Sequence, residues 1–205
     1  MFKKMPWALL YALCLLFVLL GCQASLTGIK PPLEEEGEVY LYIQPFPQEA
    51  DRLRFTLEEV FAVSGDGREI PFTVSLAELK APDLRRQRLL AHGRVPPGLY
   101  VALSFKVKKA VLKVEEGEAS LLLPERPVRI DFPFTVSRKR AQVISLTFRY
   151  EGSIIGGISF SPSFSVVTPA KPISSLAGYV TNKASHNITV FDKKLRQVVG
   201  VIATG

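Results

Sequence analysis

The sequence is poor in the residues that catalysis and metal binding usually require. It has two cysteines and two histidines among 205 residues. Cys14 and Cys22 both stand near the start of the chain, so no pair remains for a disulfide in the part that folds. His92, expected in the loop before Arg94, and His186, expected in a turn of the tail, have no partner at the spacing of zinc ligands. We therefore predict no metal site and no cofactor.

The motifs of common catalytic sites are also missing from the sequence. It has no Gly-x-Ser-x-Gly elbow, no His-Glu-x-x-His pair and no glycine-rich phosphate loop. Its carboxylates fall in turns beside lysines. We assign no catalytic residue and predict that the chain is not an enzyme.

One long apolar run is present, at the amino terminus. Lys3 and Lys4 precede 16 residues without a charge, Met5 to Leu20. A membrane-spanning helix needs about 20 apolar residues, and Pro6 interrupts this shorter run near its start. The pattern predicts a signal peptide. An uncleaved membrane helix and ordinary secretion are the two alternatives.

The run ends in Leu19-Leu20-Gly21-Cys22, which resembles the lipobox of bacterial lipoproteins. The resemblance implies that the signal is removed after Gly21, a small residue. It also implies that the thiol of Cys22 carries diacylglycerol and that its freed amine is acylated, for example by palmitate. Two or three acyl chains hold a protein stably on a bilayer. In such lipoproteins of diderm bacteria an Asp after the Cys often marks retention at the inner membrane. The resemblance therefore implies that Gln23 permits export to the outer membrane, at its periplasmic or surface face.

Removal of the signal leaves 184 residues with 24 basic and 19 acidic side chains, a net charge of +5. This mild excess, on an exported chain, argues against a nucleic-acid partner. The expected partners are the membrane, reached through lipid on Cys22, and an envelope polysaccharide or another envelope protein. The expected location is the cell envelope.

Composition divides the chain into a signal peptide and four further parts. Residues 1–21 are the signal, and residues 22–37 form a tether with a proline pair and an acidic run. At about 3.1 Å per residue this tether extends to roughly 45 Å, so it is either a spacer or a plain solvated linker. Residues 38–169 form a β-sandwich, residues 170–176 a linker, and residues 177–205 a partial propeller blade.

Short runs of β-branched and aromatic residues between turns predict an all-β fold, an antiparallel immunoglobulin-like β-sandwich. The apolar residues in Leu53 to Val63 fit both the two-residue alternation of a strand and the spacing of a helix face. The turn at Ser64 to Gly67 favours the strand, because it is a hairpin turn. Leu76 to Leu90 is the best candidate for a short helix or an irregular crossing. Three neighbouring arginines in this stretch either grip phosphate or carboxylate, or form a solvated face. They are Arg85, Arg86 and Arg88.

The turn Val95-Pro96-Pro97-Gly98-Leu99-Tyr100 precedes a long strand pattern, and Asp131-Phe132 follows about 30 residues later. Gly98 can take φ > 0, and proline cannot donate to a ladder, so both suit the margin of a sheet. This order is similar to an uncharacterised family of bacterial lipoprotein sandwich domains, whose turn begins with Leu where this chain has Val95. The resemblance implies a sandwich with an inward-facing aromatic after the turn, and it implies no activity.

The tail reads Ala177-Gly178-Tyr179-Val180-Thr181-Asn182, then His186 to Asp192, then Val198 to Gly205. It resembles the opening repeat of the Tyr-Val-Thr-Asn family of bacterial β-propellers. The resemblance implies a three-stranded β-meander in which Asn182 and Asp192 bond turn backbones. Apolar residues of the three strands would fill the layers between blades: Tyr179, Val180, Ile188, Val190, Val199 and Val201.

A propeller has four to eight blades, and this chain has part of one. Two interpretations follow. The reading frame is truncated or split from a longer propeller lipoprotein, which we favour, or the three strands pack back on the sandwich.

Three functions remain open. The first is a lipid-anchored envelope protein without catalytic activity, whose sandwich is a stalk for a truncated β-propeller binding domain. The second is a self-contained module that grips a glycan or envelope polymer through exposed aromatics such as Tyr40, Tyr42 or Phe46. The third is an accessory part of an envelope enzyme whose chemistry lies in a missing propeller.

Overall fold

The computed structural model describes residues 35–170 and 176–203. Gly21 and Cys22, with the signal peptide and most of the tether and linker, lie outside the described residues. Within them the chain forms strands and short 3-10 turns and no α-helix, which confirms the all-β prediction. The 3-10 turns are η1 (Gln48–Ala50), η2 (Ala81–Asp83) and η4 (Lys183–Ser185).

Five strands form the first sheet, in the order β13-β10-β1-β6-β4. The central strand β1 pairs antiparallel with β6 and parallel with β10. The parallel pair departs from the predicted antiparallel pattern, whereas every other pair of named strands in the described residues is antiparallel. The chain comes from β9 (Val128–Val136) of the second sheet to the free edge of β1 and runs along it in the same direction. The bounds are β1 (Gly37–Ile43), β4 (Thr73–Val74), β6 (Arg88–Val95), β10 (Ala141–Arg149) and β13 (Ser163–Val167).

The second sheet follows the order β3-β2-β7-β8, with β5 also pairing β2 and β9 pairing β7. Its axis is the antiparallel pair β2 (Leu53–Ser64) and β7 (Gly98–Val114). The interpretation of Leu53 to Val63 as a strand is therefore confirmed. The other strands are β3 (Glu69–Pro71), β5 (Glu78–Lys80), β8 (Gly117–Ser120) and β9 (Val128–Val136), and a separate hairpin joins β11 (Ile154–Ile155) to β12 (Ser159–Phe160).

The core lies between these two sheets, as a sandwich requires. Alternation along β1 sends Val39, Leu41 and Ile43 into it, and all three are fully buried. Aromatic rings from both sheets meet there; the rings of Phe55, on β2, and Phe148, on β10, have centroids 5.5 Å apart. Burial of such rings is a main source of stability in a domain that has no disulfide among its described residues.

The aromatic residue after the Pro-Pro-Gly turn faces inward, as the resemblance to other sandwich domains implies. Tyr100 is buried, its ring lies 5.2 Å from that of Phe134, and its hydroxyl donates a 2.8 Å hydrogen bond to the carbonyl of Pro96. Gly98 has φ of 154°. This bond closes the turn against the strand that it starts.

The stretch from Leu76 to Leu90 is an irregular crossing and not a helix. It contains β5, the turn η2 and the first residues of β6. Pro82 lies in the first turn of η2, where its missing N–H costs no hydrogen bond. Leu79 and Leu84 anchor the crossing in the core.

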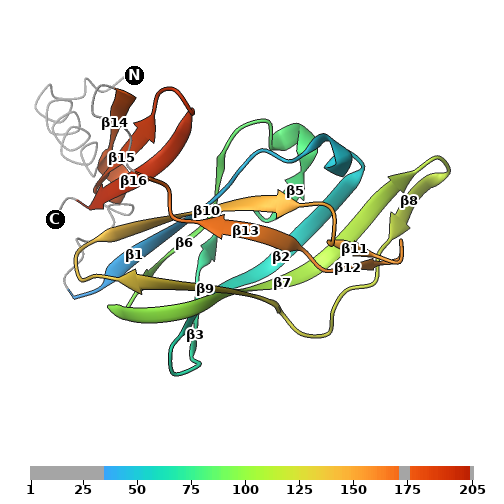
Figure 1. Ribbon diagram of the computed structural model, residues 1–205, viewed down its shortest axis with the longest axis horizontal. Coiled ribbons are helices and arrows are strands. Elements are labelled where there is room, and N and C mark those ends of the chain that lie inside the picture. Colours follow the sequence, from blue (N-terminus) through green and yellow to red (C-terminus); the bar gives the residue numbers. More distant parts are fainter. Residues whose placement is uncertain (1–34, 171–175, 204–205) are drawn as a thin grey trace, which may run out of the picture.

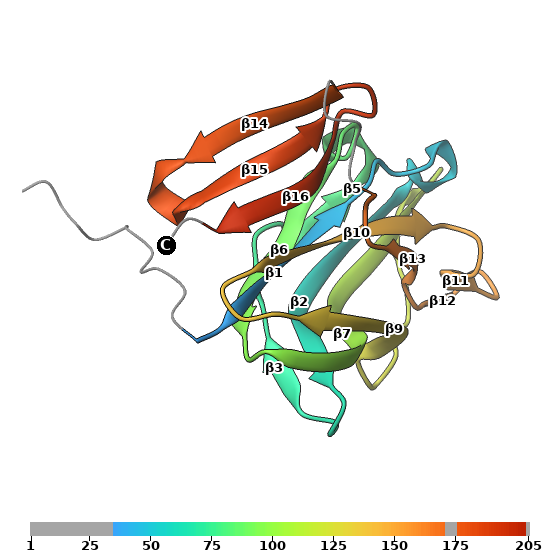
Figure 2. The same cartoon turned by 60° about the vertical axis from the view of Figure 1, so that its left-hand side comes forward.

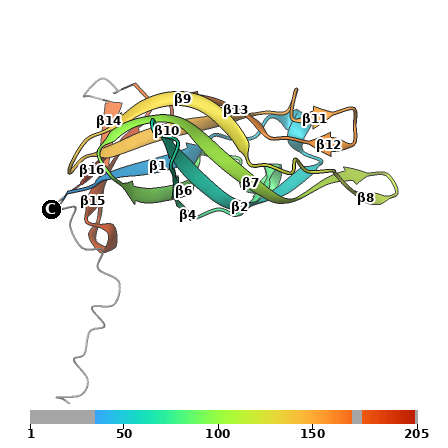
Figure 3. The ribbon, with the colours of Figure 1, turned by 90° about the horizontal axis from the view of Figure 1, so that it is seen from below.

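The tail forms an antiparallel meander of β14 (Ala177–Asn182), β15 (Asn187–Asp192) and β16 (Gln197–Ala203). Figures 1 and 2 show these strands beside the first sheet, with β16 nearest to β10 and β1. The strand β8 lies at the opposite end of the molecule (Figure 3). The described strands of the tail therefore pack back on the sandwich, which is the second of the two arrangements considered above.

Candidate functional site

The outer face of the first sheet is the surface on which the meander rests. On β1, the residues that alternate with the core positions are Glu38, Tyr40 and Tyr42. Across the strand pair, Tyr40 lies opposite His92 and Glu38 lies opposite Arg94. This face is therefore built from polar and aromatic side chains. We call the contact of the meander with it the junction.

The junction is closed by a hydrogen bond between side chains far apart in the sequence. The Asn187 side-chain amide donates to the phenolic oxygen of Tyr40 at 2.8 Å. Tyr40 is only 6% exposed, and its burial raises the pKa of the phenol to about 12. The imidazole of His92 stacks on the Tyr40 ring with centroids 6.0 Å apart, and its Nδ1 lies 3.2 Å from Oγ of Ser75.

Apolar and polar contacts extend the junction on both sides of Tyr40. Val143 and Val201 form a small buried cluster with Tyr40. Farther along, the Gln44 amide donates to Oγ of Ser145 at 2.6 Å and to Oε1 of Gln197 at 3.1 Å. The meander and the sandwich are thus joined by packed side chains as well as by the chain that connects them.

A cavity of about 720 Å³, the junction cavity, opens between the meander and the turn from β9 to β10. Lys139 and Arg140 line it from that turn, and Tyr179 lines it from the meander. The cavity also has apolar and neutral polar walls, which include Gln142, Thr168, Val190 and Ile202. Pockets that bind small molecules have this mixture of apolar walls and a few placed polar groups.

Local backbone bonds fix the cationic wall of the junction cavity. The Lys139 amide donates to the carbonyl of Glu36 at 2.9 Å, and Lys139 has a positive φ of 57°. The neighbouring Arg138 points elsewhere and pairs with Glu35 at 2.7 Å. The turn is therefore held against the start of β1, and two of its three cations face the cavity.

The aromatics expected to be exposed for glycan binding are not free surface residues. The meander covers Tyr40, and Tyr42 is half-buried beside it. Phe46 is half-buried because its ring stacks on Phe148 at 4.6 Å, at the edge of the core. That part of the prediction is wrong, since the sequence does not show that the tail folds over the outer face of β1.

One of the two histidines lies in a strand and the other in a turn. His92 lies within β6 and not in a loop, so its predicted position is wrong, because β6 continues through Arg94 to Val95. His186 lies in the turn between β14 and β15, as expected, with a positive φ of 46°. In the described part of the chain, no group of three or more His, Cys, Asp and Glu side chains is arranged to hold a metal ion.

The residues singled out in the tail have mixed outcomes. Oδ1 of Asp192 accepts hydrogen bonds from the backbone of Lys194 and Leu195 at 2.7 and 2.8 Å, as predicted. Asn182 instead donates to the side chains of Asn187 and Thr189. The six apolar residues predicted to fill the layers between blades differ in exposure. Val199 and Val201 are buried, Tyr179 and Val180 are exposed, and Ile188 and Val190 are half-buried.

The three arginines of the crossing are all exposed, but they do not share one environment. Arg88 approaches the carbonyl of Asp83 at 3.5 Å. Arg86 lines a second, smaller cavity at the junction together with residues of the meander. The sequence could not reveal this second group, because its members are separated by more than half of the chain.

No protein-family model matches the chain, and no match is found among curated proteins or solved structures. The resemblances to a bacterial lipoprotein and to Tyr-Val-Thr-Asn propellers therefore stay predictions. In residues 35–170 and 176–203 no helix is both long and apolar enough to span a membrane.

Proposed function

We propose that this chain is a lipid-anchored, non-catalytic protein of the cell envelope whose sandwich and meander together bind an envelope polysaccharide. The observation that carries the proposal is the junction cavity, about 720 Å³ in volume, with cations on one wall and an exposed tyrosine on the other. The lipobox-like sequence ending at Cys22 supports the anchor.

The lining of the cavity suits a sugar polymer that bears acidic groups. Tyr179 is 64% exposed, so one face of its ring is open to stack on an apolar ligand surface. Lys139 and Arg140 offer charged donors to a carboxylate or phosphate. Gln142 and Thr168 add neutral partners for hydroxyl groups.

Binding should be measured with the full-length chain in a neutral detergent against immobilised envelope polysaccharides, both acidic and uncharged. We expect the acidic polymers to bind, and Tyr179→Ala or the pair Lys139→Gln with Arg140→Gln to lower affinity at least about tenfold, or 1.4 kcal/mol. Arg138→Gln is the matched control, because Arg138 lies in the same turn and pairs with Glu35. Equal losses in the control, or no binding by the unaltered chain, would reject the cavity as the site.

The anchor is tested separately by metabolic labelling with palmitate. The unaltered chain should incorporate label and sediment with membranes, and Cys22→Ser should lose the label. Label that persists in the serine variant would show that Cys22 is not the lipidated residue.

A second candidate function is the stalk of a larger propeller protein. It is favoured by apolar residues that the meander leaves exposed, namely Tyr179, Val180 and Ile202. Sequencing the DNA beyond codon 205 tests it. Further blade repeats in any frame would favour the stalk, and unrelated sequence would favour the self-contained binding module.

A further inference from the structure

We propose that a second cavity at the junction, lined by Arg86, Lys193 and Arg196, is a binding site for a phosphate ester. We call it the basic pocket. Its volume is about 270 Å³, and Gln87, Phe191, Gln197 and Val198 complete its lining. It is separate from the junction cavity, and the proposal depends on neither the polysaccharide nor the lipid anchor.

The pocket exists only because distant segments meet. Arg86 comes from the crossing between η2 and β6, whereas Lys193 and Arg196 come from the turn between β15 and β16. None of the residues that line it is acidic. Among the described residues, these three cations form no ion pair with a carboxylate, so their charge is available to an anion.

The turn that supplies two of the cations is held rigidly. Oδ1 of Asp192 accepts from the amides of Lys194 and Leu195, and the Lys193 amide donates to the carbonyl of Leu176 at 2.9 Å. Arg196 has a positive φ of 54°. A fixed turn presents its charges with less loss of conformational entropy on binding than a loose loop does.

Gln87 supplies a donor whose direction is determined. Its Oε1 accepts a hydrogen bond from the backbone amide of Val198, and only the oxygen of the side-chain amide can accept. The Nε2 group must therefore point away from this bond. It is buried and has no acceptor among the described residues. An unsatisfied buried donor costs about 1–3 kcal/mol. Neighbouring atoms cover Nε2, so a phosphate oxygen would relieve this cost only after a small movement of the lining uncovers the nitrogen.

Two guanidinium groups, one ammonium and one amide donor form a set suited to phosphate, whose oxygens accept several charge-assisted hydrogen bonds. A phosphate ester can come from the headgroup of an anionic phospholipid or from a free phosphorylated molecule. Leu195, 61% exposed at the tip of the same turn, offers an apolar contact that only a lipid would use. The experiment must therefore compare both sources.

The test is a titration of the full-length chain in a neutral detergent, followed by calorimetry and by the Nε–H signals of arginine in NMR spectra. The probes are inorganic phosphate, glycerol 3-phosphate, a short-chain phosphatidylglycerol and, as the uncharged-headgroup comparison, a short-chain phosphatidylcholine. We expect the phosphate esters to bind, and Arg86→Gln and Arg196→Gln each to weaken binding at least about tenfold. Gln87→Glu should abolish it, because it keeps the acceptor for Val198 but replaces the donor with a negative charge.

Matched controls separate a built site from diffuse positive charge. Arg85→Gln and Lys194→Gln remove the same charge from the residues next to Arg86 and Lys193, and neither lines the pocket. They should change affinity less than about twofold. Losses equal to those of the pocket variants, or no binding of any phosphate ester, would overturn the proposal. If phosphatidylglycerol binds more tightly than glycerol 3-phosphate, the site is assigned to a lipid headgroup. If the two bind equally, it is assigned to a soluble phosphate ester. Either result supports a phosphate site.

Discussion

Asn187 of the meander and Tyr40 of the central strand are joined by a buried hydrogen bond of 2.8 Å, across 147 positions of sequence. Asn187 is itself oriented by Asn182, whose amide donates to its Oδ1 at 2.8 Å. This chain of contacts sets how the meander sits on the sandwich. The junction cavity is lined by Val143 and Val201, which pack with Tyr40, so the geometry of this cavity depends on the bond.

Asn187→Ala is expected to lower the free energy of unfolding by about 1–3 kcal/mol, since it leaves buried polar groups without their partner. The measurement is denaturant unfolding. Thr181→Ala, a change at an exposed position of β14, should have an effect below about 0.5 kcal/mol. Equal stability of the two variants would show that the junction bond contributes nothing.

Alkaline pH should destabilise the protein through Tyr40. The phenol has a pKa of about 12 in the folded state and near 10 when unfolded, so its contribution is intact below pH 10. It is lost as the pH rises from about 10 to 12, because the unfolded chain ionises first. We expect this loss to be about 1–2 kcal/mol after partial solvent screening.

Tyr40→Phe is the comparison that isolates this effect, since other tyrosines and lysines also titrate in the same range. The variant should be less stable at neutral pH, but its stability should fall less steeply above pH 10. If the free energy of unfolding fell equally with pH in the two proteins above pH 10, the assignment to Tyr40 would be wrong.

Gly178→Ala should destabilise the meander. A Cβ atom at Gly178 would lie 2.2 Å from the ring of Phe191, so the ring would have to move. We expect a loss of about 1–3 kcal/mol in thermal or denaturant unfolding. Gly200→Ala is the control, because its nearest neighbour is at 3.6 Å. The Phe191→Leu change should relieve part of the loss in a double variant, and strict additivity would argue against the clash.

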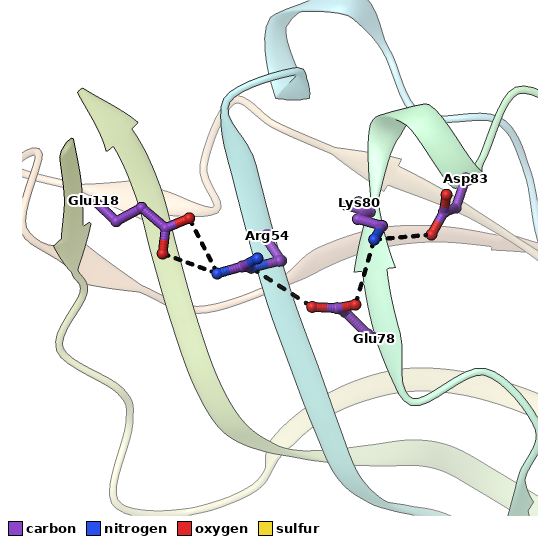
Figure 4. A network of polar contacts seen from close by, with 5 residues as sticks. All are labelled: Arg54, Glu78, Lys80, Asp83 and Glu118. Atoms are coloured by element: carbon purple, nitrogen blue, oxygen red, sulfur yellow. Dashed lines mark hydrogen bonds and ion pairs between the residues drawn. The ribbon is translucent and has the colours of Figure 1, made fainter. Parts of the chain in front are cut away.

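The ion pairs around Arg54 should contribute little. Figure 4 shows Arg54 between Glu118, at 2.8 Å, and Glu78, at 3.5 Å, with Lys80 linking Glu78 to Asp83. These side chains are about half exposed, so Arg54→Gln should cost less than about 1 kcal/mol. The cost should vanish in roughly 1 M salt, where the Debye length is about 3 Å. A larger cost that survives salt would indicate a packing role, and Arg52→Gln provides the charge-matched control.

Local pattern was sufficient for most strands but not for the sites. The alternation in Val39 to Ile43 and the turn after Ser64 predict strands because side-chain period and turn chemistry are local properties. The exposure of Tyr40 was predicted wrongly, since it depends on what covers the outer face of β1. In the sequence, Arg86 is one of three neighbouring arginines that fit either an anion site or a solvated face. Nothing in the sequence links it to Lys193 or Arg196.

By itself, the sequence determined that this protein is built of strands and that residues 35–170 and 176–203 hold no cysteine, so this part of the chain folds without a disulfide. That an apolar leader is removed before Cys22 stays a prediction. These features follow from composition and from neighbours along the chain. Only the tertiary structure decided that the tail rests on the sandwich, that Tyr40 is buried, and that two cavities form beside the junction. Such features arise from contacts between segments that lie tens to more than a hundred residues apart, whose pairing depends on shape and packing across the whole domain.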